Sequence, residues 1–222
     1  MSECEKLPLV VLISGSGSNL QAIIDATAVD LPVEVRAVIS NCPGVFGLTR
    51  AEQAGIPARV LNHQGFPDRE AYDRELMSLI DSYQPGLVVL AGFMRILTPT
   101  FVRHYAGRLF NIHPSLLPKF RGLHTHQRAL DAGELLHGVS VHFVTEELDG
   151  GPLIAQAHVP VQPEDSAEQL AARVLKREHQ IYPLVIGWFA EQRLTLDRDG
   201  MVIFDGEALR QPVTFTADQP IR

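Results

Sequence analysis

The sequence has few cysteines and no long apolar run. Cys4 and Cys42 are its two cysteines among 222 residues. Cys4 lies in an acidic-polar terminus, so we expect no structural disulfide, and Cys42 is expected to be a loop thiol rather than a reactive one. No apolar run approaches the roughly 18 residues that a membrane span needs. The N-terminus also lacks a basic region and a signal-type apolar stretch, which predicts a cytoplasmic protein without membrane association.

Negative charge is missing from one long segment of an otherwise acidic chain. The formal net charge of −7 argues against a general nucleic-acid binder. No carboxylate occurs between Asp81 and Asp131. The basic and titratable side chains of this segment are Arg95, Arg103, His104, Arg108, His113, Lys119, Arg121, His124, His126 and Arg128. This distribution fits either a solvated basic surface or a cleft that binds a small polyanion. The charge distribution by itself slightly favours the solvated surface.

The first half of the chain alternates between apolar strands and amphipathic helices. Strand-like runs occupy residues 7–14, 33–40, 57–62, 86–92 and 108–113. Asp68 and Thr98 are expected N-caps of the helices that begin after them, the second with Pro99 in its first turn. Strands that are apolar throughout are buried on both faces, and their alternation with helices requires parallel crossovers. The pattern predicts an α/β fold with a doubly wound, mostly parallel, Rossmann-like sheet.

The second half predicts antiparallel additions to that sheet. Residues 138–145 and 152–161 alternate in hydrophobicity around a tight EELDGGP loop, and a helix is expected over 124–133. Ser166 and Gln169 form a capping-box pattern for a long helix that ends near Gln192. The segment RLTLDRDGMVIF then predicts a small hairpin that turns at Asp199–Gly200. The last dozen residues are polar and contain proline, so we expect them to be loose.

A glycine-containing turn, SGSGSN at 14–19, separates the first strand from the first helix. Backbone N–H groups at such a turn, together with the helix dipole, form an anion site. The dinucleotide-binding fingerprint is incomplete, because Leu20 stands where it needs a third glycine, and the lysine of a P-loop is absent. A plain tight turn is the alternative. The side-chain donors of Ser18 and Asn19 favour a site for a phosphate monoester.

The segment LAGFMRIL, residues 90–97, follows the fourth strand at its carboxyl end. Open α/β sheets bind ligands at this edge. Met94, Ile96 and Leu97 can line an apolar slot whose backbone groups hydrogen-bond a flat heterocycle. Ordinary packing under a loop fits this stretch equally well.

Asn111 and His113 stand two apart in LFNIHPSLLP, so their side chains share one face of a strand. An amide donor beside an imidazole suits an oxyanion in acyl transfer. No serine or cysteine occupies a recognisable nucleophile elbow, which favours direct transfer over a covalent intermediate. Asp149 is the candidate carboxylate to orient His113, although a plain turn aspartate is common.

A metal site is the less favoured interpretation of the histidine-rich region. His124 and His126 lie on different faces of the expected helix, and no HExxH motif or carboxylate cluster accompanies them. We therefore predict no metal. His137 and His142 belong to the same region and are expected to support the site.

An ordered set of motifs resembles the family of phosphoribosylglycinamide formyltransferases, the folate-dependent enzymes of purine synthesis. The set is VVLISGSGSNLQAIID, REAYDREL, VVLAGFMRIL, NIHPSLLP, GLHTHQRAL, GVSVHFVTEELDGGP and REHQIYPLVI. The resemblance extends over residues 8–190. NIHPSLLP with the LDGGP loop is typical of the wider folate formyltransferase superfamily, and SGSGSN, FMRIL and REH narrow the resemblance to this member.

The resemblance implies a reaction and the residues that carry it. The amine of glycinamide ribonucleotide would attack the formyl carbon of 10-formyltetrahydrofolate directly. Asn111 and protonated His113 would stabilise the oxyanion, and Asp149 would orient His113 and help to relay the proton of the amine towards the leaving folate nitrogen. Residues implied for the ribonucleotide are Gly17, Ser18, Asn19 and Glu178. Residues implied for the folate are Arg69, Met94, Arg95, Ile96, Leu97, Asn111, Thr145, Glu146, Glu147, Leu148 and Asp149. Supporting positions are Ser140 and His142.

The same resemblance implies one formyltransferase domain over residues 1–222. Its parts would be a phosphate-binding and nucleotide-binding half (1–110), a catalytic and folate-binding half (111–195) and a C-terminal hairpin and tail (196–222). The expected partners are the two small substrates, with no nucleic acid, and the expected state is a monomer or weak homodimer.

Three alternatives to this interpretation differ in partner or in chemistry. Methionyl-tRNA formyltransferase and formyltetrahydrofolate hydrolase share the catalytic set, but we expect neither the additional tRNA-binding domain of the first nor the regulatory domain of the second. A non-catalytic nucleotide-binding module of similar fold would make the set Asn111, His113 and Asp149 a coincidence.

Overall fold

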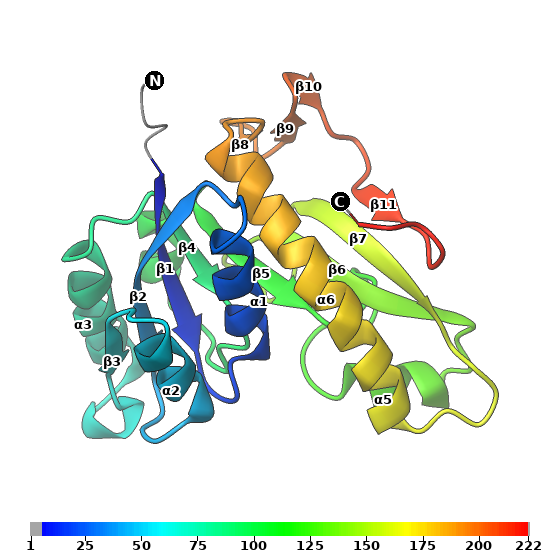
Figure 1. The fold of residues 1–222 in the computed structure, drawn as a ribbon, viewed down its shortest axis with the longest axis horizontal. Coiled ribbons are helices and arrows are strands. Elements are labelled where there is room, and N and C mark those ends of the chain that lie inside the picture. The colour runs from blue at the N-terminus through cyan, green and yellow to red at the C-terminus, as the bar shows by residue number, and fades with distance from the viewer. Residues whose placement is uncertain (1–5, 222) are drawn as a thin grey trace. The chain divides into compact units, whose positions relative to one another are not determined.

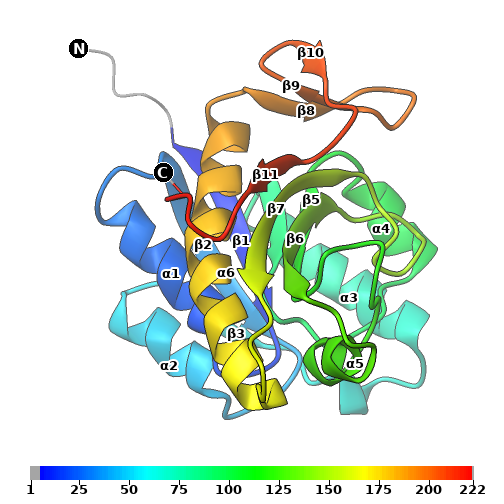
Figure 2. The ribbon, with the colours of Figure 1, turned by 90° about the vertical axis from the view of Figure 1, so that its right-hand side faces the viewer.

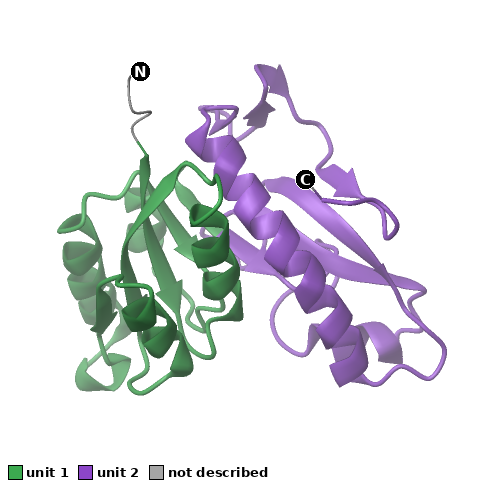
Figure 3. Cartoon of the chain, in the orientation of Figure 1, with its two compact units in different colours: residues 1–110 green, residues 111–222 purple. Residues whose placement is uncertain are grey.

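The computed structural model describes residues 6–221 (Figure 1). Cys4 lies outside the described residues. The chain divides into two compact units, Met1–Phe110 and Asn111–Arg222 (Figure 3). The division falls inside strand β5 (Leu109–His113). No helix in the described part of the chain is both long and apolar enough to cross a membrane.

Unit 1 alternates strands and helices around a parallel sheet. Its strands pair in the order β3 (Ala58–Val60), β2 (Val33–Ser40), β1 (Leu7–Ile13), β4 (Leu87–Leu90), each parallel to its neighbour. The intervening helices are α1 (Ser18–Thr27), α2 (Phe46–Gln53), the 3-10 helix η1 (His63–Gly65), α3 (Arg69–Asp81) and α4 (Pro99–His104). The residues of β1 from Leu9 to Ile13 are fully buried, as expected for a strand that is covered on both faces. The predicted α/β class with parallel strands is confirmed.

Two helices of unit 1 begin at the capping residues that the sequence predicts. The Asp68 carboxylate accepts a hydrogen bond from the Ala71 backbone N–H at 2.7 Å. The Thr98 hydroxyl accepts from the Phe101 N–H at 3.3 Å, and Pro99 occupies the first turn of α4. Each cap satisfies a donor that a helix start leaves without a partner.

Unit 2 contains an antiparallel strand pair and a long helix. Strands β6 (Leu136–Phe143) and β7 (Leu153–Pro160) pair antiparallel, and α6 (Ala167–Ala190) packs against both (Figure 2). The capping box of Ser166 and Gln169 is present at the start of α6. Helix α5 (Thr125–Asp131) also packs against α6. The predicted hairpin forms from β8 (Leu194–Leu196) and β9 (Val202–Phe204), and β10 (Glu207–Ala208) extends it to a small antiparallel sheet.

The expectation that the last dozen residues are loose is wrong for residues 213–219. Strand β11 (Val213–Phe215) pairs in parallel with β7. The Phe215 side chain is buried, and its ring stacks at 6.4 Å from the ring of Trp188 on α6. Arg177, also on α6, donates to the carbonyl oxygens of Thr216 and Gln219 at 2.8 and 3.0 Å. The buried Phe215 ring and the hydrogen bonds from Arg177 stabilise this segment, although its polar composition predicts no order.

Candidate active site

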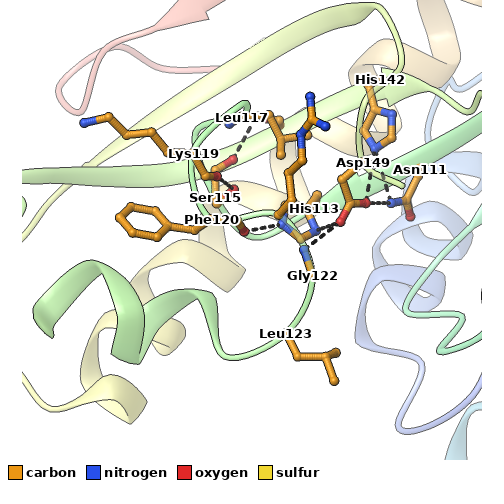
Figure 4. A network of polar contacts seen from close by, with 12 residues as sticks. Asn111, His113, Ser115, Leu117, Lys119, Phe120, Gly122, Leu123, His142 and Asp149 are labelled. Carbon is orange, nitrogen blue, oxygen red and sulfur yellow. Dashed lines mark hydrogen bonds and ion pairs between the residues drawn. The ribbon is translucent and has the colours of Figure 1, made fainter. Parts of the chain in front are cut away.

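Asn111, His113 and Asp149 come together within unit 2 (Figure 4). The alternation of β5 points the Asn111 and His113 side chains to one face and Ile112 into the core. The Asp149 carboxylate contacts both: Oδ1 accepts from Asn111 Nδ2 at 3.4 Å, and Oδ2 lies 3.5 Å from His113 Nδ1. The side chains of His113 and Asp149 are only 7% and 8% exposed. The site is therefore a shielded histidine–carboxylate contact with an amide beside it.

The loop between β6 and β7 holds Asp149 by its backbone. Asp149 has a φ of 48°, a left-handed conformation that aspartate tolerates better than most residues. A Cβ atom on Gly151 would lie 1.8 Å from the Phe143 carbonyl oxygen, so only glycine fits there. The Gly122 backbone N–H donates to Asp149 Oδ2 at 2.9 Å. These contacts fix the position of the carboxylate before any ligand binds.

The His113 ring has an acceptor at each nitrogen. Nδ1 faces the Asp149 carboxylate, and Nε2 donates to the Phe120 carbonyl oxygen at 2.9 Å (Figure 4). A neutral imidazole carries one N–H, whereas the imidazolium carries two. A ring protonated at both nitrogens can donate to the Phe120 carbonyl oxygen from Nε2 while its positively charged Nδ1–H faces the Asp149 carboxylate. The arrangement therefore suits a positively charged His113 that is balanced by Asp149.

His142 lies on the other side of Asn111. Its Nδ1 donates to the Phe143 carbonyl oxygen at 2.8 Å, and its Nε2 lies 3.3 Å from Asn111 Nδ2. Burial lowers the pKa of His142, which keeps the ring neutral and its Nε2 an acceptor. Asn111 can therefore donate one amide hydrogen to His142 and the other to Asp149. These two contacts orient the amide.

A second buried network fixes the chain just after His113. Ser140 Oγ donates to the Ser115 carbonyl oxygen at 2.7 Å and accepts from the Leu117 N–H at 3.0 Å. Gln156 on β7 donates from Nε2 to Ser140 Oγ at 2.8 Å and to the Leu117 carbonyl oxygen at 2.9 Å. The structure thus places Ser140 behind the PSLL segment. Sequence reasoning missed Gln156, although a single amide inside an otherwise apolar strand was a usable signal.

His137 forms a separate pair with His126. The His137 ring is 1% exposed, hydrogen-bonds the Pro114 backbone, and places Nε2 at 3.2 Å from His126 Nδ1. Burial, reinforced by His126, lowers the pKa of His137 to about 4. Burial also lowers the pKa of His126. In the range from residue 6 to residue 221, no cluster of three His, Cys, Asp or Glu side chains has the geometry to hold a metal ion.

We expect the free energy of unfolding to fall as the pH drops below neutral, and His137→Gln to flatten that fall. The unfolded ring binds a proton near pH 6.5, whereas the folded ring resists protonation down to about pH 4. The unfolded chain therefore binds more protons in this window. Stability that is present above pH 6.5 is lost as the pH approaches 4, by up to about 3 kcal/mol.

Urea unfolding at pH 7, 5.5 and 4.5 measures this loss for His137. His124→Gln, at an exposed residue of the same region, is the matched control and should keep the slope of the wild-type protein. Parallel slopes for wild-type protein and His137→Gln would contradict the assignment.

The SGSGSN turn of unit 1 is tightly packed against the start of α2. Gly17 precedes α1 with a φ of 70°, and a Cβ atom on it would lie 2.7 Å from the Gly47 Cα. The Gly47 N–H donates to the Gly15 carbonyl oxygen at 3.1 Å. Arg50 Nε donates to the Ser16 carbonyl oxygen at 2.8 Å. Sequence reasoning missed Gly47 and Arg50, because both lie on α2, outside the SGSGSN motif.

Gly17→Ala should distort this turn and weaken anion binding. The substitution combines left-handed strain of about 1–2 kcal/mol with a backbone clash that no rotamer can relieve. Gly55→Ala is the matched control, because Gly55 has the same φ of 70° and nothing within 4 Å of the added atom.

Chemical denaturation and a phosphate-monoester titration would be run on both glycine variants. Gly17→Ala should lose more stability than Gly55→Ala and bind the monoester at least tenfold more weakly, about 1.4 kcal/mol. Equal effects of the two substitutions would show that the contact with Gly47 is unimportant.

The segment after β4 leaves large apolar side chains in solvent. Met94 and Ile96 are 69% and 56% exposed, and Leu97 is half-buried. The segment itself is anchored, because the Thr98 N–H donates at 2.7 Å to the buried Asp73 carboxylate of α3. The Arg95 guanidinium lies 4.5 Å above the ring centre of Tyr72. Exposed apolar side chains on a backbone that is anchored at Thr98 suit the binding of a flat ligand.

The remaining predicted residues are divided between the two units. Arg69 is exposed at the first position of α3 in unit 1. Gly17, Ser18 and Asn19 belong to unit 1, whereas Glu178 is buried on α6 in unit 2. The other members of the folate set are Thr145, half-buried, and Glu146, Glu147 and Leu148, exposed in the loop before Asp149. Glu147 forms an ion pair with Arg121.

Comparisons with known proteins agree over most of the chain. The model of the formyl transferase family matches residues 7–186. The chain is 59% identical over 212 residues to the phosphoribosylglycinamide formyltransferase of Escherichia coli (strain K12), covering 95% of this chain and 99% of that protein. It is 50% identical over 202 residues to the Haemophilus influenzae protein of that name, covering 90% and 95%. A structure of the Coxiella burnetii phosphoribosylglycinamide formyltransferase in complex with CHES superposes with a TM-score of 0.92 at 54% identity, covering 95% of this chain and all of that one.

Proposed function

Because this chain belongs to the formyl transferase family, we propose that it transfers the formyl group of 10-formyltetrahydrofolate to the amine of glycinamide ribonucleotide. The products are formylglycinamide ribonucleotide and tetrahydrofolate, in purine biosynthesis. The observation that carries the proposal is the convergence of Asn111, His113 and Asp149 in a chain that resembles phosphoribosylglycinamide formyltransferases over nearly their whole length.

The reaction joins the ribonucleotide amine to the formyl carbon and then breaks the bond from that carbon to the folate nitrogen. The formyl oxygen carries negative charge in between, and it needs positioned donors. Asn111 Nδ2 and the His113 imidazolium would supply them, and the formyl oxygen would replace Asp149 Oδ1, now 3.4 Å away, as the acceptor of one Asn111 amide hydrogen. His113 Nε2 donates to the Phe120 carbonyl in the present arrangement, so the formyl oxygen would replace that carbonyl as its acceptor.

Asp149 supports this chemistry in two ways. Its negative charge, 3.5 Å from His113 Nδ1, stabilises the imidazolium in a site from which water is largely excluded. Its carboxylate can also take part in moving one proton from the attacking amine to the leaving folate nitrogen, which balances the reaction. The neutral His142 ring orients Asn111 from the opposite side.

The substrate sites follow from the anchored segments. The backbone N–H groups of residues 17–19 at the start of α1 suit the ribonucleotide phosphate, and Glu178 is assigned to its ribose or amine end. The segment Met94–Leu97 and the loop 145–149 are assigned to the folate, with Arg69 at its outer end. Exposure of Met94 and Ile96 on an anchored backbone supports this assignment.

Formyl transfer by the purified protein tests the proposal directly. The assay contains glycinamide ribonucleotide and 10-formyltetrahydrofolate, follows the folate absorbance, includes a chelator, and has a parallel sample without the ribonucleotide. Turnover that needs the ribonucleotide and ignores the chelator is expected. Folate release without the ribonucleotide would indicate a hydrolase, and loss of turnover with the chelator would indicate a metal.

We also propose that the enzyme acts in the cytoplasm as a monomer or weak homodimer. Sedimentation equilibrium across the working concentration range tests the second part of this statement. A stable larger assembly would contradict it.

A further inference from the structure

Ser14 belongs to the turn that we assign to the phosphate, and it contacts the segment of unit 1 that we assign to the folate. It is the first residue of the SGSGSN turn and follows β1 directly. Its backbone N–H donates to the Gly92 carbonyl oxygen at 3.1 Å, and its hydroxyl accepts from the Met94 N–H at 2.8 Å. The Met94 backbone belongs to the segment that we assign to the folate. One side chain therefore connects the phosphate turn with the folate segment.

Asn41 determines that the Ser14 hydroxyl is the acceptor in its hydrogen bond with Met94. Ser14 Oγ donates its single hydrogen to Asn41 Oδ1, so the hydroxyl meets Met94 only as an acceptor. Asn41 is 3% exposed at the end of β2, and its Nδ2 lies 3.2 Å from His63 Nδ1. The chain of bonds crosses the carboxyl ends of β4, β1 and β2, the edge at which open parallel sheets bind ligands.

The other end of the folate segment has anchors of its own. Asp73 accepts from the Thr98 N–H, and Arg95 stacks on Tyr72, both from α3. These contacts are independent of the phosphate turn. The bond from Met94 to Ser14 is thus the route by which a change in the phosphate turn can reach the folate segment through a side chain.

We propose that Ser14 is a positioning residue that couples the binding of the two substrates. A phosphate bound to the N–H groups of residues 17–19 restricts the turn, and the restricted Ser14 hydroxyl holds the Met94 N–H in place. The folate then binds to a segment whose ordering has already occurred, so each substrate binds more tightly when the other is present. This inference rests on the proposed function, because it assigns the two segments to the two substrates.

The coupling is measured as the ratio of the tetrahydrofolate dissociation constants without and with glycinamide ribonucleotide. Tetrahydrofolate has no formyl group to transfer, so its binding can be measured by calorimetry with and without saturating glycinamide ribonucleotide. For the wild-type protein we expect tighter binding with the ribonucleotide, by a factor on the order of ten. Ser14→Ala should reduce that factor to below about two, and Ser14→Thr, which keeps the hydroxyl, should restore most of it.

Asp73→Asn is the matched control, because it weakens the other anchor of the same segment. It should weaken tetrahydrofolate binding equally with and without the ribonucleotide, which leaves the ratio unchanged. A purely structural role of Ser14 would give this same pattern for Ser14→Ala. Melting curves of each variant establish that the folded protein is being compared.

The possible outcomes separate the coupling from the proposed function. A tenfold ratio that survives in Ser14→Ala overturns the coupling role. A ratio near one in the wild-type protein overturns it as well, and intact formyl transfer in that protein would leave the proposed function standing. Wild-type protein that neither binds the ribonucleotide nor turns over contradicts the proposed function, and the coupling falls with it.

Discussion

His113→Ala should lower kcat by about 10²–10⁴-fold while the KM of either substrate changes little. In the proposed mechanism the protonated His113 ring, which faces the Asp149 carboxylate and lies against the Phe120 carbonyl oxygen, is the charged donor to the formyl oxygen. Alanine supplies no substitute. The missing interaction matters most when charge develops on the formyl oxygen. Steady-state kinetics with both substrates varied would separate kcat from KM.

A histidine outside the cluster gives the control for this substitution. His124→Ala removes an exposed ring that precedes α5 and should leave kcat within about twofold, as is usual for surface positions. An unchanged kcat with a raised KM in His113→Ala would make His113 a binding residue and would contradict the role proposed for it.

Asp149→Asn should lower kcat by about 10²–10³-fold, the effect expected when an active site loses one preorganised electrostatic contribution to the transition state. The carboxylate accepts from Asn111 and Gly122 and faces His113, whereas an amide has only one oxygen and brings two hydrogens of its own. At least one of these donors then meets another donor. Single-turnover measurements at saturating substrate would show the loss in the transfer step itself.

An exposed aspartate provides the comparison for Asp149→Asn. Asp131→Asn makes the same chemical change at the end of α5 and should leave kcat almost unaltered. Asp149→Asn with more than about a tenth of wild-type kcat would contradict a role for the charge, because that loss is well below the expected 10²–10³-fold.

The parallel half of the fold and the long helix α6 were predictable because their signals are local. Wholly apolar strands, the Asp68 and Thr98 caps, and the capping box of Ser166 and Gln169 act within a few residues of each other. Strand β11 was not predictable in this way. Its order depends on Trp188 and Arg177 of α6, which lie far from it in sequence, so its own polar composition was misleading.

The candidate site divides along a similar line. The spacing of Asn111 and His113 and the glycines after Asp149 indicate these three side chains from the sequence alone. The acceptor of His113 Nε2 is the Phe120 carbonyl, and a donor to Asp149 is the Gly122 N–H. Nearly every residue carries such backbone groups, so no residue type marks them. Only the path of the chain between β5 and α5 brings them to the site.

The pairing of β11 with β7 also bears on how copies of this protein behave towards one another. An unpaired strand at the end of a sheet offers a row of free backbone groups to any other extended chain. In unit 2 the backbone groups of Ala155–Ala157 on β7 pair with those of Val213–Phe215 of the same molecule. What remains outermost is a strand of three residues, too short to recruit a neighbour readily. The C-terminal segment therefore shortens the open edge of β7, and we expect this to make edge-to-edge association of two copies less favourable.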